Sequence, residues 1–268
     1  MATSMIVCGA AGRMGRTLIS LITQNPATTL VGAVEAAGHP ALGQDAGLVA
    51  GVGPLGVALG DDLAAVAQTE TVTLDFSTAT AAMLHLQTAV QRRSAIVIGA
   101  TGFSSEQEAL VERLAQQTRT VVAPNMSVGI AVLQRLVRAA ASTLGADFDP
   151  EIVEMHHRMK VDAPSGTALA LGRTLADATG RDFPADAVYG RSGMVGQRQQ
   201  KEIGILALRG GDVVGDHTVI FAGLGERIEL THRAQSRECL ARGAIRAGLW
   251  LADQPPGRYG MSDVLGMR

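Results

Sequence analysis

The chain has 268 residues, of which 47% are hydrophobic but only 3% aromatic, and its formal net charge is -2 at pH 7. The length allows two packed domains. The near-neutral charge, without a long Lys/Arg block, argues against nucleic acid as a partner. No apolar run is long enough to span a bilayer and the start has no basic, apolar leader, so we expect a cytoplasmic protein without a membrane partner. Cys8 and Cys239 lie far apart and are expected to be buried thiols in a reducing compartment.

Short apolar strands alternate with helical segments through the first half of the chain. Strands are expected at residues 5–8, 29–34, 71–76, 95–99 and 120–123, and helices at residues 13–23, 79–92 and 105–117. The glycine-rich segment 38–60 interrupts this alternation, and we expect a long surface connection there with at most one irregular helical turn. The alternation predicts an α/β fold with a Rossmann-type, doubly wound parallel sheet.

The pattern changes after Asn125. Helices are expected at residues 128–144, 165–179 and 237–252, strands at residues 152–155, 203–208, 218–221 and 228–232, and a Gly- and Arg-rich loop up to residue 200. The last three strands follow one another through short turns, which favours an antiparallel or mixed sheet. The final helix is amphipathic and is expected to pack onto the first domain. We therefore place a dinucleotide-binding domain at residues 1–126, completed by residues 237–268, and a second, α+β domain with a mixed open sheet at residues 127–236.

A glycine-rich turn joins the first predicted strand to the first helix. Its sequence is Gly9-Ala10-Ala11-Gly12-Arg13-Met14-Gly15. Glycines stand where a tight turn and a close approach of the backbone to a pyrophosphate are needed. The spacing is Gly-x-x-Gly-x-x-Gly instead of Gly-x-Gly-x-x-Gly, but an acidic residue, Glu35, follows about 20 positions later, as in dinucleotide-binding folds. The turn therefore predicts a dinucleotide cofactor.

The choice between NADH and NADPH depends on two residues with opposite tendencies. Glu35, at the end of the second strand, is suited to accept hydrogen bonds from ribose hydroxyls and to repel a 2′-phosphate, which favours NADH. Arg13 could lie over the adenine or reach a 2′-phosphate, although an arginine at a helix start is often only solvated. We expect use of both cofactors with a preference for NADH.

Two further turns lie at the carboxyl ends of predicted strands, where doubly wound sheets bind ligands. Their sequences are Gly99-Ala100-Thr101-Gly102 and Pro124-Asn125-Met126-Ser127. Both could surround a nicotinamide, and both could be ordinary strand-to-helix turns capped by Thr, Ser or Asn. Their position alone leaves the two interpretations open.

The segment from residue 154 to residue 168 is the richest in reactive side chains. It reads Glu154-Met155-His156-His157-Arg158-Met159-Lys160-Val161-Asp162-Ala163-Pro164-Ser165-Gly166-Thr167-Ala168. An imidazole can give or take a proton near neutral pH, and a helix that begins at Ser165 offers N–H groups to an anion. Adjacent histidines on a strand point in opposite directions and no other His or Cys has metal-ligand spacing, so no metal is expected. If both histidines serve one pocket, the strand must end near Met155.

Together these motifs resemble the 4-hydroxy-tetrahydrodipicolinate reductase (dihydrodipicolinate reductase) family. The resemblance rests on the Glu154–Ala168 segment, the Gly9–Gly15 turn, the Gly99–Phe103 turn and the sequence Asn125-Met126-Ser127-Val128-Gly129. It therefore covers both predicted domains. It implies a Rossmann domain and an inserted substrate-binding domain whose sheet builds a homotetramer.

The resemblance also implies roles for individual residues. His156 is expected to be the proton donor, Lys160 a second donor and His157 a substrate contact. Ser165, Gly166 and Thr167 are expected at a substrate carboxylate. The cofactor residues are expected to be Gly9, Ala10, Ala11, Gly12, Arg13 and Met14 at the pyrophosphate, Glu35 at the ribose, and Gly99, Ala100, Thr101, Ala123, Pro124, Asn125 and Met126 around the nicotinamide. Some members carry an arginine directly after the acidic residue, whereas this chain has Ala36, which weakens the expectation of NADPH use.

The implied reaction is the NAD(P)H-dependent reduction of 4-hydroxy-2,3,4,5-tetrahydrodipicolinate to 2,3,4,5-tetrahydrodipicolinate, with loss of water, in the diaminopimelate route to lysine. Hydride would reach ring C4 of a cyclic imine that carries two carboxylates. His156 would supply the proton, and Lys160 would hold a carboxylate or assist as an acid. How these two residues divide the proton transfer is left open.

Two other functions are compatible with parts of the sequence. Another Rossmann oxidoreductase, such as an amino-acid or semialdehyde dehydrogenase, would need a reactive cysteine or an additional acid near the nicotinamide, and neither Cys8 nor Cys239 fits. A non-catalytic NAD-sensing regulator would share the glycine turn and Glu35 but would have no use for His156 beside Lys160. The residues alone lead to a nicotinamide-dependent reductase of a small acid.

Overall fold

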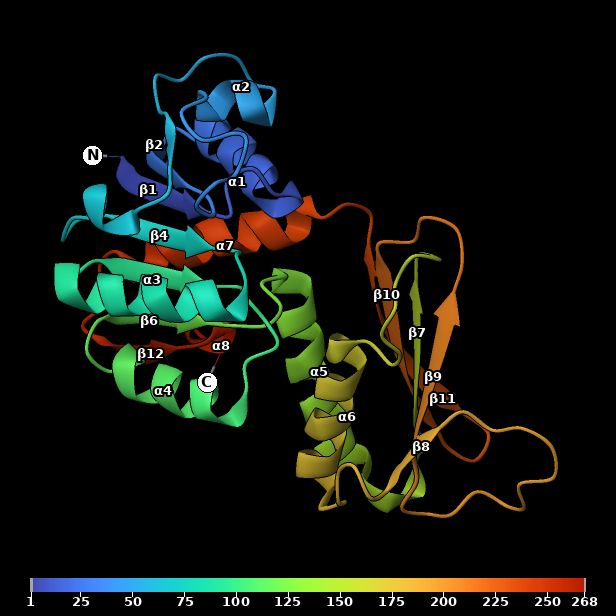
Figure 1. Cartoon of the computed structure of the whole chain (residues 1–268). Coiled ribbons are helices and arrows are strands. Elements are labelled where there is room, and N and C mark those ends of the chain that lie inside the picture. Colours follow the sequence, from blue (N-terminus) through green and yellow to red (C-terminus); the bar gives the residue numbers. More distant parts are fainter. Residues whose placement is uncertain (1, 268) are drawn as a thin grey trace. The chain divides into compact units, whose positions relative to one another are not determined.

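The computed structural model describes residues 2–267 and divides into two compact units (Figure 1). Unit 1 combines Met1–Val128 with Glu238–Arg268, and unit 2 is Gly129–Arg237. The boundaries expected from the sequence lie at 126/127 and 236/237. Within residues 2–267, no helix is both long and apolar enough to cross a bilayer.

Unit 1 is built on a seven-stranded sheet in which all paired strands are parallel. Its strands are β1 (Thr3–Cys8), β2 (Thr28–Val34), β3 (Leu59–Gly60), β4 (Val72–Asp75), β5 (Ala95–Ile98), β6 (Arg119–Val122) and β12 (Gly257–Tyr259). The order is β12-β6-β5-β4-β1-β2-β3. Strands β2 and β3 therefore lie on one side of β1, and the other four lie on its opposite side. The predicted doubly wound parallel sheet is confirmed, and its ligand-binding crevice is expected at the carboxyl ends of β1 and β4.

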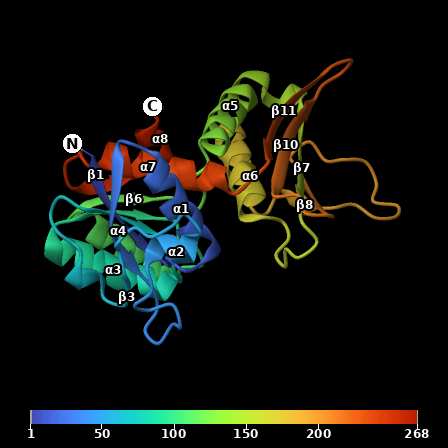
Figure 2. The same ribbon diagram turned by 90° about the horizontal axis from the view of Figure 1, so that it is seen from above.

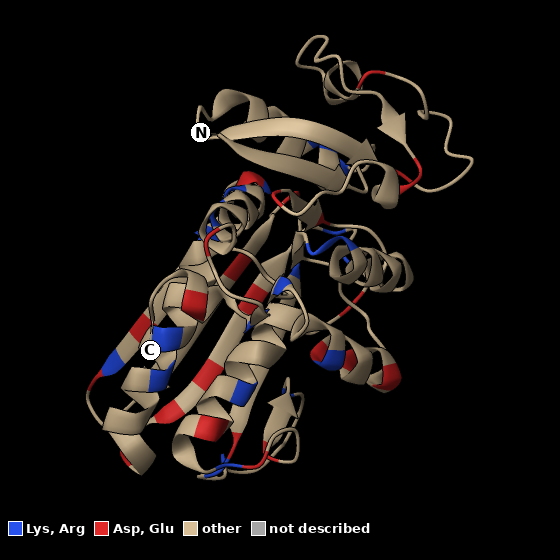
Figure 3. Cartoon of the chain, turned by 90° about the vertical axis from the view of Figure 1, so that its left-hand side faces the viewer, with Lys and Arg blue, Asp and Glu red and all other residues tan. Residues whose placement is uncertain are grey.

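Helices cover both faces of this sheet. Helix α1 (Arg13–Gln24) packs beside α7 (Glu238–Leu251), and α3 (Ala79–Arg92) packs beside α4 (Ser105–Ala115). Short helices complete the unit: α2 (Ala46–Ala50), η1 (Leu63–Ala65) and α8 (Met261–Val264). The expected packing of the final long helix is confirmed, because α7 contacts α1, β4, β5 and β6. On the face drawn in Figure 3, Lys and Arg are interspersed with Asp and Glu.

Unit 2 combines a five-stranded sheet with helices on one face (Figure 2). Its strands are β7 (Asp149–His156), β8 (Ala187–Tyr189), β9 (Ile203–Arg209), β10 (Gly215–Ala222) and β11 (Arg227–Ala234), in the order β11-β10-β7-β9-β8. Its helices are α5 (Val128–Leu144), the short η2 (Gly145–Asp147) and α6 (Gly166–Thr179). Strand β10 is antiparallel to β7 and β11, whereas β9 is parallel to β7 and β8, so the predicted mixed sheet is confirmed.

Strand alternation separates two kinds of side chain on β7. Ile152 faces the helices and is fully buried with Leu171, Leu175 and Val219 in an apolar core. Glu154 and His156 follow at intervals of two, so they point to the same face of the sheet as Ile152. The helix-covered face is therefore apolar along most of β7 and polar where the strand ends.

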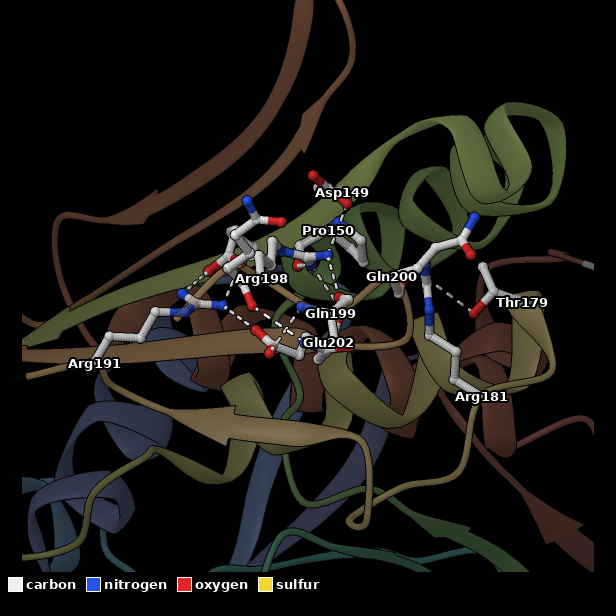
Figure 4. A network of polar contacts seen from close by, with 11 residues as sticks. Asp149, Pro150, Thr179, Arg181, Arg191, Arg198, Gln199, Gln200 and Glu202 are labelled. Carbon is white, nitrogen blue, oxygen red and sulfur yellow. Dashed lines mark hydrogen bonds and ion pairs between the residues drawn. The ribbon is translucent and has the colours of Figure 1, made fainter. Parts of the chain in front are cut away.

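A network of charged side chains fixes the Gly- and Arg-rich loop before β9 (Figure 4). Arg198 donates to Asp149 at 2.7 Å and to Glu151 at 2.9 Å, and Arg191 donates to Glu151 and Glu202, each at 2.9 Å. These bonds tie the loop to the start of β7. The loop contains the short strand β8, which the sequence had not predicted.

The cysteines differ from each other in burial. Cys8 is buried in β1, as expected, and burial raises the pKa of its thiol well above the ordinary value. Cys239 is only partly buried, so the expectation of two buried thiols was wrong for this residue. It is the second residue of α7 and is not among the buried residues of that helix.

Candidate active site

The turn between β1 and α1 requires its glycines. Gly9 has a φ of +75°, a backbone conformation that favours glycine. A Cβ on Gly15 would lie 2.1 Å from the carbonyl oxygen of Gly9 and 2.7 Å from the Cα of Ala10. Helix α1 therefore starts in direct backbone contact with the turn, which keeps the turn compact at the carboxyl end of β1.

Glu35 reaches this turn from the end of β2. Its Oε2 accepts the N–H of Ala11 at 2.9 Å, and its Oε1 accepts the N–H of Ala36 at 3.0 Å. Arg16 donates to the carbonyl oxygen of Ala11 at 2.8 Å. The structure therefore brings the predicted ribose residue and the predicted pyrophosphate turn together, although 24 residues separate Glu35 from Ala11. Arg13 is exposed beside them at the start of α1.

The remaining residues predicted for the cofactor follow β5 and β6. A Cβ on Gly99 would lie 2.4 Å from the ring of Phe76, so this glycine makes room for an aromatic ring that follows β4. Asn125 accepts the N–H of Ser127 at 2.9 Å and so shapes the turn after β6. Ala100, Ala123 and Met126 are buried. Thr101 and Pro124 are exposed.

In unit 2, Glu154 and His156 form a hydrogen-bonded pair at the polar end of β7. Nδ1 of His156 lies 2.6 Å from Oε2 of Glu154. The Glu154 side chain is completely buried, whereas 12% of the His156 side chain is exposed. The strand continues through His156, one residue further than Met155, and His157 then lies outside it. One imidazole is thus anchored in the unit while one edge of it reaches the surface.

Glu154 accepts hydrogen bonds from three parts of unit 2. Arg209 lies at the end of β9, and each of its two terminal nitrogens donates a hydrogen bond to the carboxylate at 2.9 Å. The backbone N–H of Ser165 donates to Oε1 at 3.0 Å. Burial opposes ionisation, but the hydrogen bonds from Arg209, His156 and Ser165 outweigh it and lower the pKa of the Glu154 carboxyl. Glu154 is therefore an ionised, buried carboxylate.

A second histidine, His217, lies on β10 directly opposite Glu154 in the sheet register. Its ring is edge-on to that of His156, with 5.2 Å between centroids and 77° between planes. Nε2 of His217 lies 3.0 Å from Oγ of Ser165. Burial, followed by the nearby His156, lowers the pKa of His217 to about 4. His217 is therefore neutral at physiological pH.

The first residues of α6 lie beside this histidine pair. Ser165 is the N-cap: its Oγ accepts the N–H of Ala168 at 3.2 Å. Ser165 is buried and its own N–H is taken by Glu154, so its hydrogen bonds organise the helix start. A contact between Ser165 and substrate stays a prediction. Gly166 is exposed, and a Cβ added there would meet no atom within 4 Å.

Lys160 lies in the loop between β7 and α6. Its Nζ donates to both carboxylate oxygens of Asp162 at 2.8 Å. This bond lowers the pKa of the Asp162 carboxyl. The ammonium is mostly shielded, and a carboxylate already binds it, so Lys160 has the environment of an anion-binding cation. His157 precedes it and is half-buried.

Sequence reasoning missed three residues of this cluster. The residue pattern predicts no role for Arg209, His217 or Glu154. Arg209 is 55 residues from Glu154, and His217 is 52 residues from Ser165. Only the pairing of β7 with β9 and β10 brings them together, and nothing local in the sequence specifies that pairing. Among residues 2–267, no three His, Cys, Asp or Glu side chains are grouped to hold a metal ion.

Comparison with known families matches both parts of the chain. The family described as dihydrodipicolinate reductase, N-terminus, matches residues 3–126, and the family described as dihydrodipicolinate reductase, C-terminus, matches residues 129–265. This chain belongs to the dihydrodipicolinate reductase family. The resemblance inferred from the motifs is thereby confirmed.

Similar proteins in this family match along the whole chain. Two are named 4-hydroxy-tetrahydrodipicolinate reductase: the protein of Geobacter sulfurreducens is 49% identical, covering 99% of this chain and 100% of the relative, and that of Syntrophotalea carbinolica is 52% identical, covering 98% of each. The solved structure of a dipicolinate-bound dihydrodipicolinate reductase from Paenisporosarcina sp. TG-14 superposes with a TM-score of 0.75. It is 24% identical and covers 97% of this chain and 98% of the other, so it supports the fold. The chain is thus an oxidoreductase of the pyridine-nucleotide-dependent type with a Rossmann unit.

Proposed function

We propose that this chain reduces 4-hydroxy-2,3,4,5-tetrahydrodipicolinate to 2,3,4,5-tetrahydrodipicolinate, with loss of water, in lysine and diaminopimelate biosynthesis. Relatives that match along their whole length carry the name of this activity. The observation that carries the proposal lies in unit 2, where His156 is anchored on buried Glu154 beside the start of α6. A proton donor next to an anion-binding helix start suits a small, dianionic substrate.

Unit 1 has the features that a nicotinamide dinucleotide requires. The compact turn after β1 leads directly into α1, whose N-terminal N–H groups favour a pyrophosphate. Glu35 lies at the turn and is the acceptor that we assign to the adenosine ribose. When bound, the reduced nicotinamide supplies the hydride for the reaction. Residues of the turns after β5 and β6, including Gly99 and Asn125, are proposed to hold the nicotinamide.

In unit 2, three groups bind the substrate and move the proton. The Gly166 N–H has no acceptor within its own helix, since it belongs to the first helical residue, and with Thr167 it is proposed to receive one substrate carboxylate. Lys160 and His157 are proposed to contact the remainder of the dianion. His156 is proposed to protonate the ring carbon next to the one that accepts hydride. Holding the substrate in one orientation makes proton transfer effectively intramolecular.

We propose that NADH is preferred to NADPH, although both are used. Glu35 places a negative charge at the ribose position, where it would repel a 2′-phosphate. The next residue, Ala36, has no cation to offer. Exposed Arg13 is the group that could still attract a 2′-phosphate, which is why the preference is proposed to be partial.

We further propose a cytoplasmic homotetramer built on unit 2. Helices α5 and α6 cover one face of its sheet, whereas the other face carries side chains that alternate with the buried set. These include Val153, Met155, Leu206 and Leu208, of which Leu208 is 49% exposed. Covering such a face with other copies of the chain would bury apolar surface. Sedimentation-velocity measurement of the purified chain tests the stoichiometry.

An NADH oxidation assay with enzymatically generated 4-hydroxy-tetrahydrodipicolinate tests the proposed activity. We expect the absorbance of the reduced nicotinamide to fall only when the substrate is present, with NADH used more efficiently than NADPH. Binding of NADH without turnover would instead indicate an NAD sensor. Turnover of an amino acid or a semialdehyde, without turnover of this substrate, would indicate a different Rossmann oxidoreductase.

A further inference from the structure

Glu154 is an unusual residue for its position in unit 2. Its side chain is fully buried on the face of β7 that also carries the core residue Ile152. Removing an ionised carboxylate from water is costly unless charge and hydrogen bonds compensate it. Arg209 alone could neutralise the charge, since it donates twice to the carboxylate. A purely structural ion pair would therefore not need His156 as well.

The two oxygens of Glu154 face two different parts of the site. Oε2 accepts from Nδ1 of His156, whereas Oε1 accepts the backbone N–H of Ser165, the residue that caps α6. Arg209 binds both oxygens from the β9 side and so holds the plane of the carboxylate. One carboxylate therefore fixes the imidazole and the start of the helix with respect to each other.

We propose that Glu154 is a positioning residue that holds the hydrogen of His156 on Nδ1 and so makes Nε2 the atom that passes the proton to substrate. This proposal rests on the proposed function. An ionised carboxylate accepts hydrogen bonds and cannot donate them, so Nδ1 must carry its hydrogen in both the neutral and the cationic ring. In the proton-transfer step the Nε2–H bond breaks, a C–H bond forms on the substrate, and the neutral ring keeps its hydrogen on Nδ1. A proton taken up from solvent then restores the Nε2–H bond.

The surroundings of Nε2 support this assignment. A Cβ on Gly215 would lie 2.9 Å from Nε2, so the absence of a side chain at the start of β10 leaves room for this edge of the ring. His217 lies edge-on to the same ring. Gly215 thus places no side chain against the nitrogen that is proposed to react.

Titratable groups on β7, β9, β10 and the loop after β7 surround His156. Glu154 on β7 is negative, Arg209 on β9 is positive and neutralised by Glu154, and Lys160 in the loop is paired with Asp162. His217 on β10 stays neutral above its low pKa of about 4 and adds no positive charge. The carboxylate of Glu154 is therefore the charged group in direct contact with the imidazole.

The tautomer of His156 can be measured directly in the wild-type protein. Long-range ¹H–¹⁵N spectra of histidine-labelled protein, recorded at a pH where the ring is neutral, distinguish Nδ1–H from Nε2–H. We expect the Nδ1–H form for His156, whereas a solvated histidine prefers the Nε2–H form. Finding His156 in the Nε2–H form would overturn the proposal, and the measurement does not depend on any variant folding.

Glu154→Gln tests the consequence for catalysis. The amide nitrogen of Gln can donate to Nδ1, so we expect His156 to switch to the Nε2–H tautomer and kcat to fall by about 10²-fold. The pH profile of kcat/KM should change as well, because a neutral amide replaces the charged hydrogen-bond acceptor of the imidazole. An unchanged tautomer with an unchanged pH profile would contradict the proposal.

Glu151→Gln is the matched control. Glu151 lies on the same strand, but its carboxylate binds Arg191 and Arg198 instead of a histidine. We expect this variant to keep the His156 tautomer and the shape of the wild-type pH profile; a tautomer switch here too would overturn the specific role of Glu154. The two proposals fail separately. Absence of wild-type turnover would refute the proposed function, whereas the tautomer measured by NMR decides the role of Glu154.

Discussion

Oγ of Ser165 lies 3.0 Å from Nε2 of His217, and this contact joins the start of α6 to strand β10, which pairs with β7. Both side chains are buried, and Ser165 also caps the helix through the N–H of Ala168. Nδ1 of His217 is buried and has no hydrogen-bond partner among the described residues. A protonated His217 would carry a buried N–H at Nδ1 without an acceptor. We therefore expect this histidine to make the stability of the folded chain sensitive to acid.

The pKa of His217 predicts how stability depends on pH. The value is about 4 in the folded chain, against 6.5 as the ordinary value, so between these pH values the unfolded chain binds a proton that the folded chain does not. The contribution of neutral His217 is complete above pH 6.5 and is lost as the pH falls toward 4. We expect a loss of about 2 kcal/mol in the free energy of unfolding between pH 7 and pH 5 from this group.

Urea unfolding of wild type and of His217→Gln at pH 8, 7 and 5 measures this effect. Both proteins should change little between pH 8 and pH 7, where the group is neutral in either state. The variant should lose less stability than wild type between pH 7 and pH 5, because its amide does not titrate. Parallel losses in the two proteins would show that His217 is not the responsible group.

Gly166→Ala separates substrate binding from folding. A Cβ at Gly166 meets no protein atom within 4 Å, and alanine favours a helix over glycine by up to about 1 kcal/mol. We therefore expect the melting temperature to be unchanged or slightly higher. The added methyl should obstruct a carboxylate at the helix start and raise KM for the substrate, while the Kd for NADH stays the same. A wild-type KM in this variant would place the substrate elsewhere.

Ala36→Arg tests the basis of cofactor preference. Ala36 is exposed, and its backbone N–H, which donates to Glu35, is kept in the variant. An arginine there can meet a 2′-phosphate, and a gain of about 1.4 kcal/mol would raise the NADPH/NADH ratio of kcat/KM by about 10-fold. Steady-state kinetics with both cofactors gives this ratio. If the ratio does not change, the residue after Glu35 does not control the choice, and Arg13 becomes the residue to vary.

Local signals in the sequence were sufficient for the long elements. Helices α3 and α5 begin and end at the predicted residues, 79–92 and 128–144. Helix α3 starts directly after Thr78, whose side chain accepts the N–H of Ala81. Strands β3, β8 and β12 were missed because each has only two or three residues, too few to show a period. Such strands exist because a neighbouring strand pairs with them.

The candidate site likewise contains residues that the sequence predicted and residues that it did not. His156, Lys160 and Gly166 were predicted because they lie within one short segment whose residue types carry chemistry. The roles of Glu154, Arg209 and His217 depend on strand pairing and on the packing of α6, which residue types alone do not specify. For Ser165, the sequence indicated the helix start correctly, but the hydrogen bonds that occupy its side chain and N–H come from distant residues.

Replacing His156 tests the central claim most directly, because this residue is proposed to give the proton in the reaction. In His156→Gln we expect kcat with 4-hydroxy-tetrahydrodipicolinate to fall by about 10²- to 10⁴-fold, the contribution of a general acid. The Kd for NADH, measured by fluorescence titration of the same preparation, should stay at the wild-type value because unit 1 is unchanged. A kcat close to that of wild type would contradict the account.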